Sequence, residues 1–117
     1  DTSFSASNTT SSVQDFVKAY TDEYGEAPTN FCALGYDAAA IMAAGLEAAE
    51  KSGESVGSDA YKQAVIDGIA AAKVSGVTGD ISYSGTGKPY VFNGQLIKGF
   101  HVTFKDGKEE IFDTIDA

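Results

Sequence analysis

Apolar side chains recur at helical spacing in three stretches of the chain. The first stretch places five apolar or aromatic side chains on one helix face: Val13, Phe16, Val17, Tyr20 and Tyr24. Gly25 supplies the stop. We expect Ser11 or Ser12 to cap this helix, with Gln14 or Asp15 three residues on completing a capping box. The pattern predicts a well-bounded amphipathic helix.

The second stretch is apolar on nearly every face. Alanine covers most faces of the first three turns of a helix expected over about Tyr36 to Lys51. A helix that is apolar all round is normally buried, so we expect the part from Ala38 to Ala49 to be packed on at least two sides. Asn30 to Gly35, just before it, is predicted to be a short extended segment or strand.

A third helix and a glycine-rich tract follow. Ser58 is expected to cap the helix, whose apolar positions run from Tyr61 to Ala72 and stop before Gly76. The tract GVTGDISYSGTGKP then predicts turns around one short strand at about Ile81 to Tyr83.

The C-terminal stretch has the pattern of a β-hairpin. Phe100, Val102 and Phe104 alternate with polar residues, Asp106-Gly107 suits a tight turn, and Glu109 to Ile115 forms the returning strand. This alternation places His101 on the outward, solvated face.

These elements predict an α/β chain with three main helices and a C-terminal antiparallel hairpin. The 117 residues suffice for one domain, yet one hairpin gives little cover for three apolar helices. The simplest interpretation is that the missing sheet belongs to sequence outside this chain. The alternative is a compact domain of three helices and a hairpin held by Ala-rich close packing.

Charge and cysteine content exclude several classes of function. The net charge is −9, and all eight basic residues are lysine, so nucleic-acid binding is disfavoured. Cys32 is the only cysteine, which excludes an internal disulfide and a cysteine-based zinc site. No run approaches the roughly 20 apolar residues of a membrane helix, so we expect a soluble chain. The chain opens at Asp1 without a basic and apolar leader, so we expect its targeting signal to lie outside this sequence.

The candidate catalytic motifs are weak. Cys32 precedes a predicted helix, but the sequence does not place His101 beside it, and a buried, inert cysteine is the favoured interpretation. SGTGKP lacks the first glycine of a phosphate loop and has Pro89 where Ser or Thr would bind magnesium. It is predicted to be a turn between strands. We expect no enzyme activity, no metal site and no cofactor.

Tyr36 and Asp37 stand at the start of the apolar helix. Tyr36 suits either core packing or a cleft-facing position. Asp37 falls in the first helical turn, where the helix macrodipole alone accounts for a carboxylate.

Three motifs in fixed order carry a family resemblance. F-x3-Y-x3-YG starts at Phe16, YDA starts at Tyr36 and GVTG starts at Gly76. With their spacing, they resemble the C-terminal part of ABC-transporter solute-binding proteins of the branched-chain amino-acid (Leu/Ile/Val) type, from about Phe4 to the end of the chain. The resemblance implies a fragment of a two-lobe type I periplasmic-binding fold, with residues 1–117 as its incomplete C-terminal part.

The resemblance also implies a function and a site. The expected partners are a small molecule such as an amino acid, the remaining part of the same binding protein and a membrane permease, in an extracytoplasmic setting (periplasmic or cell-surface lipoprotein). Phe31 matches a ligand-contacting position of some relatives, Asn30 and Cys32 are included by proximity, and Tyr36 is the cleft candidate above. The alternative is a ligand-sensing or interaction module of a receptor that uses the same fold.

Overall fold

The structure is a computed structural model that describes residues 3–83 and 98–116. Its elements, in chain order, are α1 (Ser11–Tyr24), α2 (Asn30–Ser52), α3 (Asp59–Ala71), β1 (Lys73–Gly76), β2 (Gly79–Ser82), β3 (Lys98–Lys105) and β4 (Lys108–Asp116). Each pair of consecutive strands forms a two-stranded antiparallel sheet. The predicted α/β class, with three main helices and a C-terminal hairpin, is confirmed.

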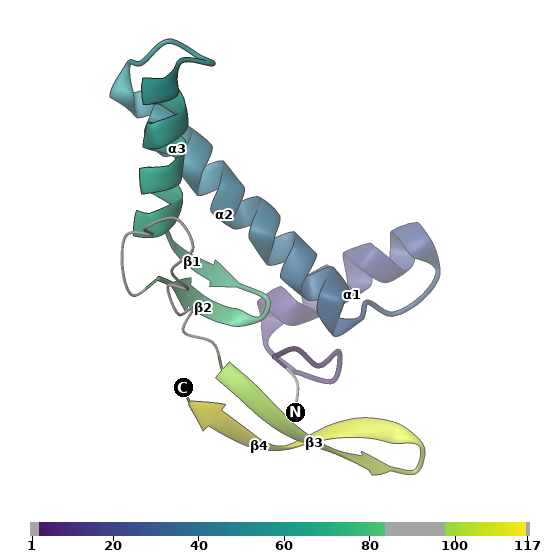
Figure 1. The fold of residues 1–117 in the computed structure, drawn as a ribbon. Coiled ribbons are helices and arrows are strands. Elements are labelled where there is room, and N and C mark those ends of the chain that lie inside the picture. The colour runs from purple at the N-terminus through teal and green to yellow at the C-terminus, as the bar shows by residue number, and fades with distance from the viewer. Residues whose placement is uncertain (1–2, 84–97, 117) are drawn as a thin grey trace.

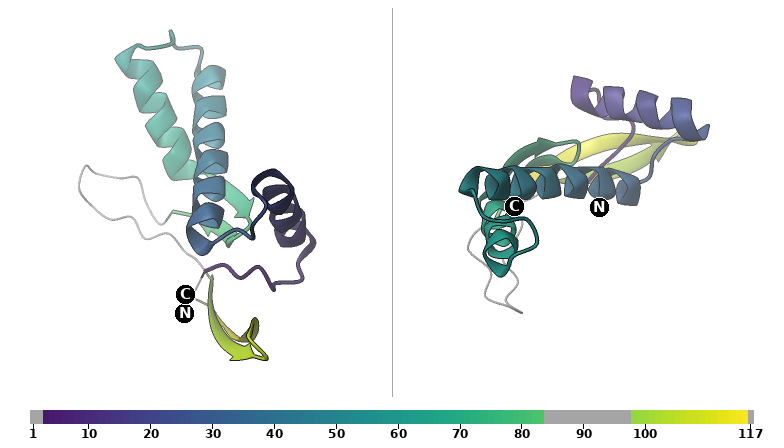
Figure 2. Two further views of the ribbon diagram at one scale, coloured as in Figure 1. Left: turned by 90° about the vertical axis from the view of Figure 1, so that its right-hand side faces the viewer. Right: turned by 90° about the horizontal axis from the view of Figure 1, so that it is seen from above.

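The molecule is elongated, measuring 55 × 31 × 21 Å, with α2 as its longest element. Helix α3 folds back along the C-terminal half of α2, and α1 lies near the opposite end (Figure 1). Both views in Figure 2 place α1 and α3 on opposite sides of α2. The β1–β2 pair lies below α3, and the β3–β4 hairpin lies farthest from the helices (Figure 1).

The predicted cap of α1 is wrong by one residue. Thr10 is the N-cap, and its side chain makes no capping hydrogen bond. The Gln14 amide instead donates back to the carbonyl groups of Ala6 (3.1 Å) and Asn8 (2.6 Å), which ties the preceding loop to the helix. The predicted stop is confirmed: Gly25 has φ 76°, and its N–H bonds the Thr21 carbonyl.

Helix α2 begins six residues before its predicted start, so the extended segment expected at Asn30 to Gly35 is wrong. Thr29 is the N-cap, and its hydroxyl accepts a hydrogen bond from the Cys32 N–H at 3.4 Å. Pro28, one residue earlier, is buried and suits the extended backbone before the cap. The apolar run after the cap resembled a strand because short apolar runs do not distinguish the two structures.

The packing of α2 follows a single stripe. Its buried residues recur at every fourth position: Ala33, Asp37, Ile41, Gly45 and Ala49. Helix α3 packs against the C-terminal part of this stripe and β1 contacts the part near Asp37. Ala39 and Ala43 are exposed and Ala40 is half-buried, so the helix has less cover than its all-round apolar pattern predicts.

By length and composition, α2 meets the criteria for a membrane-spanning helix. Sequence analysis expected no such helix, because it predicted a start at about Tyr36, whereas α2 starts at Asn30. A core helix of a soluble protein meets the same criteria, so one such helix is weak evidence for a membrane span.

Two glycines let α2 and α3 approach closely. A Cβ added at Gly68 would lie 2.6 Å from Ala48 Cβ, and one at Gly45 would lie 2.6 Å from Ile69 Cγ1. The Tyr61 hydroxyl also donates to Glu50 at 2.7 Å, joining the helices farther along. Helices α2 and α3 therefore pack through small residues where they cross, rather than through large interlocking side chains.

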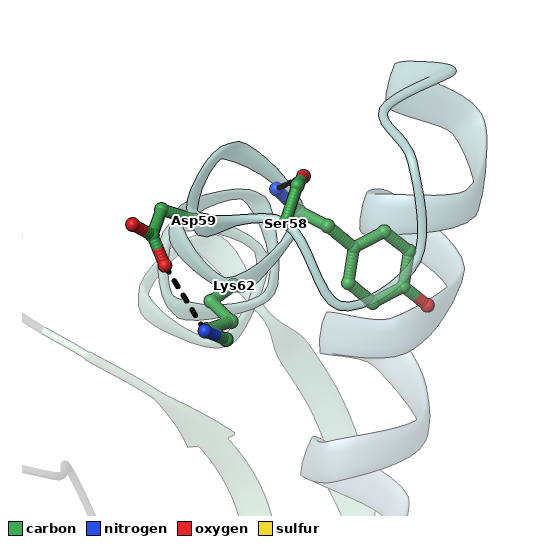
Figure 3. A network of polar contacts seen from close by, with 4 residues as sticks. Ser58, Asp59 and Lys62 are labelled. Carbon is green, nitrogen blue, oxygen red and sulfur yellow. Dashed lines mark hydrogen bonds and ion pairs between the residues drawn. The ribbon is translucent and has the colours of Figure 1, made fainter.

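The start of α3 is capped as predicted. The Ser58 hydroxyl accepts from the Tyr61 N–H at 3.1 Å. Asp59 in the first turn forms an ion pair with Lys62 at 3.0 Å (Figure 3). An acidic residue in this position also favours the positive end of the helix macrodipole.

The glycine-rich tract contains more strand than predicted. Strand β1 was missed, and it pairs with β2 so that Val74 faces Ile81 across the ladder. Strand β2 begins two residues before the expected Ile81 and ends before Tyr83. The turn predicted at SGTGKP falls in residues 84–89, outside the described residues.

The C-terminal hairpin turns where predicted. Asp106 (φ 51°) and Gly107 (φ 75°) both have left-handed backbone, as a type I′ turn requires. A register shift after His101 leaves Phe112 without a partner in the ladder and 77% exposed. His101 is exposed, as expected, and lies 3.8 Å from Asp113 on the opposite strand.

A small core joins the N-terminal segment to the helices. Its buried residues come from that segment, α1, α2 and the β1–β2 turn: Phe4, Val13, Phe16, Ala33 and Val77. The neighbouring buried Ser5 hydroxyl donates to the Glu109 carboxylate, linking this segment to β4.

Candidate functional site

The four residues predicted to bind a ligand all lie in the first two turns of α2. Because this segment is a helix, its side chains project in different directions. Phe31 and Tyr36 are five residues apart and therefore about 140° apart around the helix axis. The structure does not gather the four residues into one pocket, as an extended loop would have allowed.

Phe31 and Tyr36 are the exposed members of the set. The Phe31 side chain is 82% exposed, which is unusual for a phenylalanine. Tyr36 is 56% exposed, and its ring centroid lies 4.8 Å from that of Phe16 on α1. Phe16 in turn contacts Phe4 and Tyr20, so Tyr36 extends an aromatic cluster while Phe31 projects from the helix.

Asn30 and Cys32 form hydrogen bonds within the chain. Asn30 accepts from the Ser3 hydroxyl at 2.8 Å. The Cys32 Sγ lies 3.2 Å from the Thr29 hydroxyl and 3.3 Å from the Tyr20 hydroxyl. Both residues therefore help to hold the start of α2 against the N-terminal segment and α1.

These contacts shift the acidity of both partners. The hydrogen bond with Thr29, followed by that with Tyr20, lowers the pKa of the Cys32 thiol. The same bond with Cys32, followed by burial, raises the pKa of the Tyr20 hydroxyl to about 12. The two shifts agree, because a Cys32 thiolate would accept a hydrogen bond from a Tyr20 hydroxyl that keeps its proton. His101, considered as a base for Cys32, lies on β3 opposite Asp113.

A hollow of about 530 Å³ lies beside Tyr36, between α1, α2 and β1. Phe16, Ala19 and Ala40 form part of its apolar wall, and Ser12 and Asp15 supply polar groups. The hollow therefore has a mixed apolar and polar lining.

The buried Asp37 side chain forms part of one wall of this hollow. Its Oδ1 accepts from the Val77 N–H at 2.8 Å. Its Oδ2 accepts from the Thr78 N–H at 2.9 Å and from the Thr78 hydroxyl at 2.6 Å. Gly76 allows this approach, because a Cβ there would overlap the carboxylate. Three donors replace the water that a buried carboxylate loses.

Sequence analysis missed this contact between α2 and the β1–β2 turn. The macrodipole interpretation of Asp37 gave the residue a local explanation, whereas its partners lie about forty positions further along the chain. The available signal was the presence of both segments, YDA and GVTG, among the motifs of the family resemblance.

Within residues 3–83 and 98–116, no three His, Cys, Asp or Glu side chains gather as metal ligands. At the start of α2, Phe31 and Tyr36 offer exposed aromatic surface, whereas Asn30 and Cys32 hydrogen bond within the chain.

Comparison with known proteins identifies the family. Residues 2–102 match the sequence profile of the family described as periplasmic binding protein. The chain belongs to this family. The search of curated proteins gave no match.

Solved structures of ABC-transporter solute-binding proteins share the fold. A Rhodopseudomonas palustris solute-binding protein in complex with benzoate matches with a TM-score of 0.74 at 22% identity, over 96% of this chain and 28% of its own. A Desulfitobacterium hafniense substrate-binding protein in complex with Leu matches with a TM-score of 0.60 at 32% identity, over 93% and 29%. A putative branched-chain amino acid transporter protein from Rhodospirillum rubrum matches with a TM-score of 0.63 at 27% identity, over 95% and 29%.

These matches confirm the predicted family and its type I periplasmic-binding fold. The chain spans less than a third of the length of each of these three structures. Its two small antiparallel sheets and three helices therefore correspond to one part of a larger α/β architecture.

Proposed function

We propose that this chain is the C-terminal part of the extracytoplasmic solute-binding component of an ABC importer. In this proposal the complete protein closes two lobes around a small molecule and delivers it to a membrane permease. The observation that carries the proposal is the family match over residues 2–102, together with similarity to transporter binding proteins over more than nine-tenths of the chain. The proposed activity is binding, because this family consists of solute-binding proteins.

The proposed ligand class is a small carboxylate with an apolar body, with branched-chain or other amino acids as the first choice. The similar structures hold Leu, benzoate and 3,4-dihydroxybenzoic acid, which share those two features. The Leu complex is the most similar of these in sequence, at 32% identity, and this favours an amino acid.

Within the described residues, we propose the start of α2 as the chain's contribution to the ligand site. Phe31 provides exposed aromatic surface, and Tyr36 provides an aromatic ring with a hydroxyl group on a side chain that is about half exposed. Asn30 and Cys32 are proposed as flanking residues whose internal hydrogen bonds hold that segment in place.

A thermal-shift screen of the longer protein tests this function. Leucine, isoleucine, valine, benzoate and, as a control, glucose are added separately at increasing concentration. A ligand present at a hundred times its dissociation constant stabilises the folded state by about 2.7 kcal/mol. We expect at least one carboxylate to raise the melting temperature in a saturable manner. A response to glucose alone, or to none of the carboxylates, would contradict the proposed ligand class.

A further inference from the structure

The β1–β2 turn holds the first half of α2 by both polar and apolar contacts. Val77 and Thr78 direct three hydrogen-bond donors to the buried Asp37 carboxylate. The Val77 side chain also belongs to the buried core, together with Ala33, which lies about one helical turn before Asp37. Two adjacent residues of the turn therefore grip two successive members of the buried stripe of α2.

The polar part of this junction outweighs the other hydrogen bonds near the start of α2. The Ser3 hydroxyl donates to the Asn30 side chain, and that bond is only partly buried. The bond between Cys32 and Tyr20 is also partly buried. Hydrogen bonds to an ionised group are about twice as strong as bonds between neutral groups. Three donors on one buried carboxylate therefore make the contact at Asp37 the main polar restraint on this part of the helix.

The β1–β2 turn is itself anchored to the other half of α2. Strand β1 follows α3 after a single residue, the buried Ala72. Helix α3 packs along the C-terminal half of α2 (Figure 1), with a close approach at Gly45. The contact of Asp37 with the turn therefore closes a ring of packed elements that runs from α2 through α3 and β1 back to α2. This ring fixes the rotation of the first half of α2 relative to the rest of the helix pair.

Rotation of α2 about its axis determines where its exposed aromatic side chains lie. Side chains reach about 5 to 6 Å from a helix axis, so a rotation by about 10° moves an aromatic ring by about 1 Å. A binding site has to hold its contacting groups within about 0.5 Å of their working positions. Phe31 and Tyr36 precede Asp37 on the same helix. A rotation of this size, permitted by a weaker junction, would misplace both of these proposed ligand contacts.

We propose that Thr78 is a positioning residue for ligand binding, which acts through Asp37 to fix the rotation of α2. This inference rests on the proposed function. Thr78 does not touch the ligand, because the residue is 1% exposed and its hydroxyl donates to Asp37. Destabilisation that leaves a protein almost fully folded does not by itself change its ligand affinity. A loss of affinity in a folded Thr78 variant therefore reports positioning rather than stability.

Two hydroxyl groups that donate to carboxylates on opposite halves of α2 give a matched comparison. Thr78 donates to Asp37 at 2.6 Å, and Tyr61 donates to Glu50 at 2.7 Å. Thr78→Val and Tyr61→Phe each remove one such hydroxyl, whereas Thr78→Ser keeps it. Calorimetry with leucine and, separately, with benzoate is performed on the longer protein well below its melting temperature. We expect Thr78→Val to weaken binding by about tenfold, a usual size of coupling between two sites, and the other two variants to bind within about twofold of the unsubstituted protein.

Three results would overturn the proposal. The first is an unchanged affinity of the folded Thr78→Val variant. The second is an equal loss of affinity in Thr78→Val and Tyr61→Phe, which would assign the loss to general weakening of the contacts of α2. The third is a loss of affinity in Thr78→Ser as large as that in Thr78→Val, which would exclude the hydroxyl as the group responsible.

A fluorine resonance reports the position of Tyr36 without any ligand. Tyr36 is replaced by 3-fluorotyrosine in the longer protein, where the Phe16 ring, 4.8 Å away, should displace its resonance from that of free 3-fluorotyrosine. We expect Thr78→Val to move this resonance toward the free value and Tyr61→Phe to leave it in place. A resonance that Thr78→Val does not move would contradict positioning through α2. If the resonance moves in a protein that binds neither leucine nor benzoate, the hold of Thr78 on Tyr36 is retained and the proposed ligand class is rejected.

Discussion

The Asp37 carboxylate and the Thr78 hydroxyl lie 2.6 Å apart, although 41 positions separate the two residues in the chain. Both side chains are buried, with exposures of 2% and 1%. The contact therefore fixes the first half of α2 against the β1–β2 turn. It also fixes the orientation of the Asn30–Tyr36 segment, which precedes Asp37 on the same helix.

Replacing Thr78 by valine should weaken this junction. Thr78→Val removes one of the three donors to a buried carboxylate while keeping the side-chain shape. We expect a loss of about 1.5 to 3 kcal/mol in the free energy of unfolding, since the lost bond is to a charged group. Thr78→Ser keeps the hydroxyl and is the control. Urea denaturation measures both, and equal stability of the two variants would show that the hydroxyl contributes little.

Gly76→Ala tests the close approach of the backbone to Asp37. The added methyl group would overlap the carboxylate, so Asp37 or the turn must move. Overpacking of this kind costs about 1 to 3 kcal/mol. Gly35→Ala is a matched control, because a Cβ there meets nothing within 4 Å and the residue lies inside a helix. We expect that control to stabilise the chain by about 0.5 to 1 kcal/mol. Thermal denaturation showing the same sign for both substitutions would contradict this account.

The Cys32 thiol should ionise more readily in the folded chain than in the unfolded chain. Its pKa lies below the ordinary value of 9.0 because Thr29, and then Tyr20, hydrogen bond to the sulfur. A lowered folded-state pKa gives stability that is present above the unfolded-state pKa and is lost as pH falls through the folded-state pKa. The pH dependence of the iodoacetamide reaction should therefore have a lower midpoint in buffer than in urea.

Variants of Thr29 and Tyr20 test which hydrogen bond lowers the pKa of Cys32. Tyr20→Phe should move the midpoint upward, and Thr29→Ala should move it further, because Thr29 is the larger cause. Thr103→Ala, on the exposed strand β3, should leave it unchanged. A midpoint that stays in place in both partner variants would assign the shift to another cause.

Phe31→Ala in the longer protein should weaken ligand binding more than folding. The ring is 82% exposed in this chain, so its removal takes little from the core. A ring fully covered by ligand contributes about 1 to 3 kcal/mol, which corresponds to an affinity about fivefold to a hundredfold weaker. Calorimetry with leucine and thermal denaturation measure the two effects separately.

Phe16→Ala is the matched control for Phe31→Ala. Phe16 is buried in the aromatic cluster at 8% exposure, so its truncation should lower the melting temperature. Lost stability with unchanged affinity for Phe31→Ala would instead identify Phe31 as a core residue of the longer protein.

The 117-residue chain should bind free amino acids very weakly. Ligand sites of this size bury most of the ligand surface, whereas the start of α2 offers a single wall whose main aromatic side chain is exposed. Calorimetry with leucine, isoleucine and valine should show no saturable heat at millimolar concentration. Micromolar binding of any of them to this chain would contradict the two-lobe proposal.

Sequence reasoning succeeded where the determining interactions are local. The Ser58 cap, the Gly25 stop and the Asp106-Gly107 turn each depend on residues within a few positions of one another. The apolar faces of α1 and α3 were also predictable from the 3.6-residue period, except that Tyr24 at the end of α1 is 65% exposed. The single buried stripe of α2 was not predicted.

Non-local interactions account for most of the differences. Strand β1 has only four residues and ends in glycine, and it exists through its pairing with β2. The role of Asp37 depends on donors at Val77 and Thr78. The site prediction selected one segment, but it assumed an extended backbone, and the helix that starts after Thr29 spreads the selected side chains around its axis.

The buried stripe of α2 restricts how this helix can change in length. Successive members of the stripe are four residues apart, so it winds by about 40° per step around the axis. A single inserted residue between Asp37 and Gly45 would rotate one end of α2 against the other by about 100°. Asp37 would then lose the β1–β2 turn, or Gly45 would lose α3. Insertions and deletions within this segment should therefore be tolerated only near whole numbers of helical turns, whereas the loop between α2 and α3 carries no such constraint.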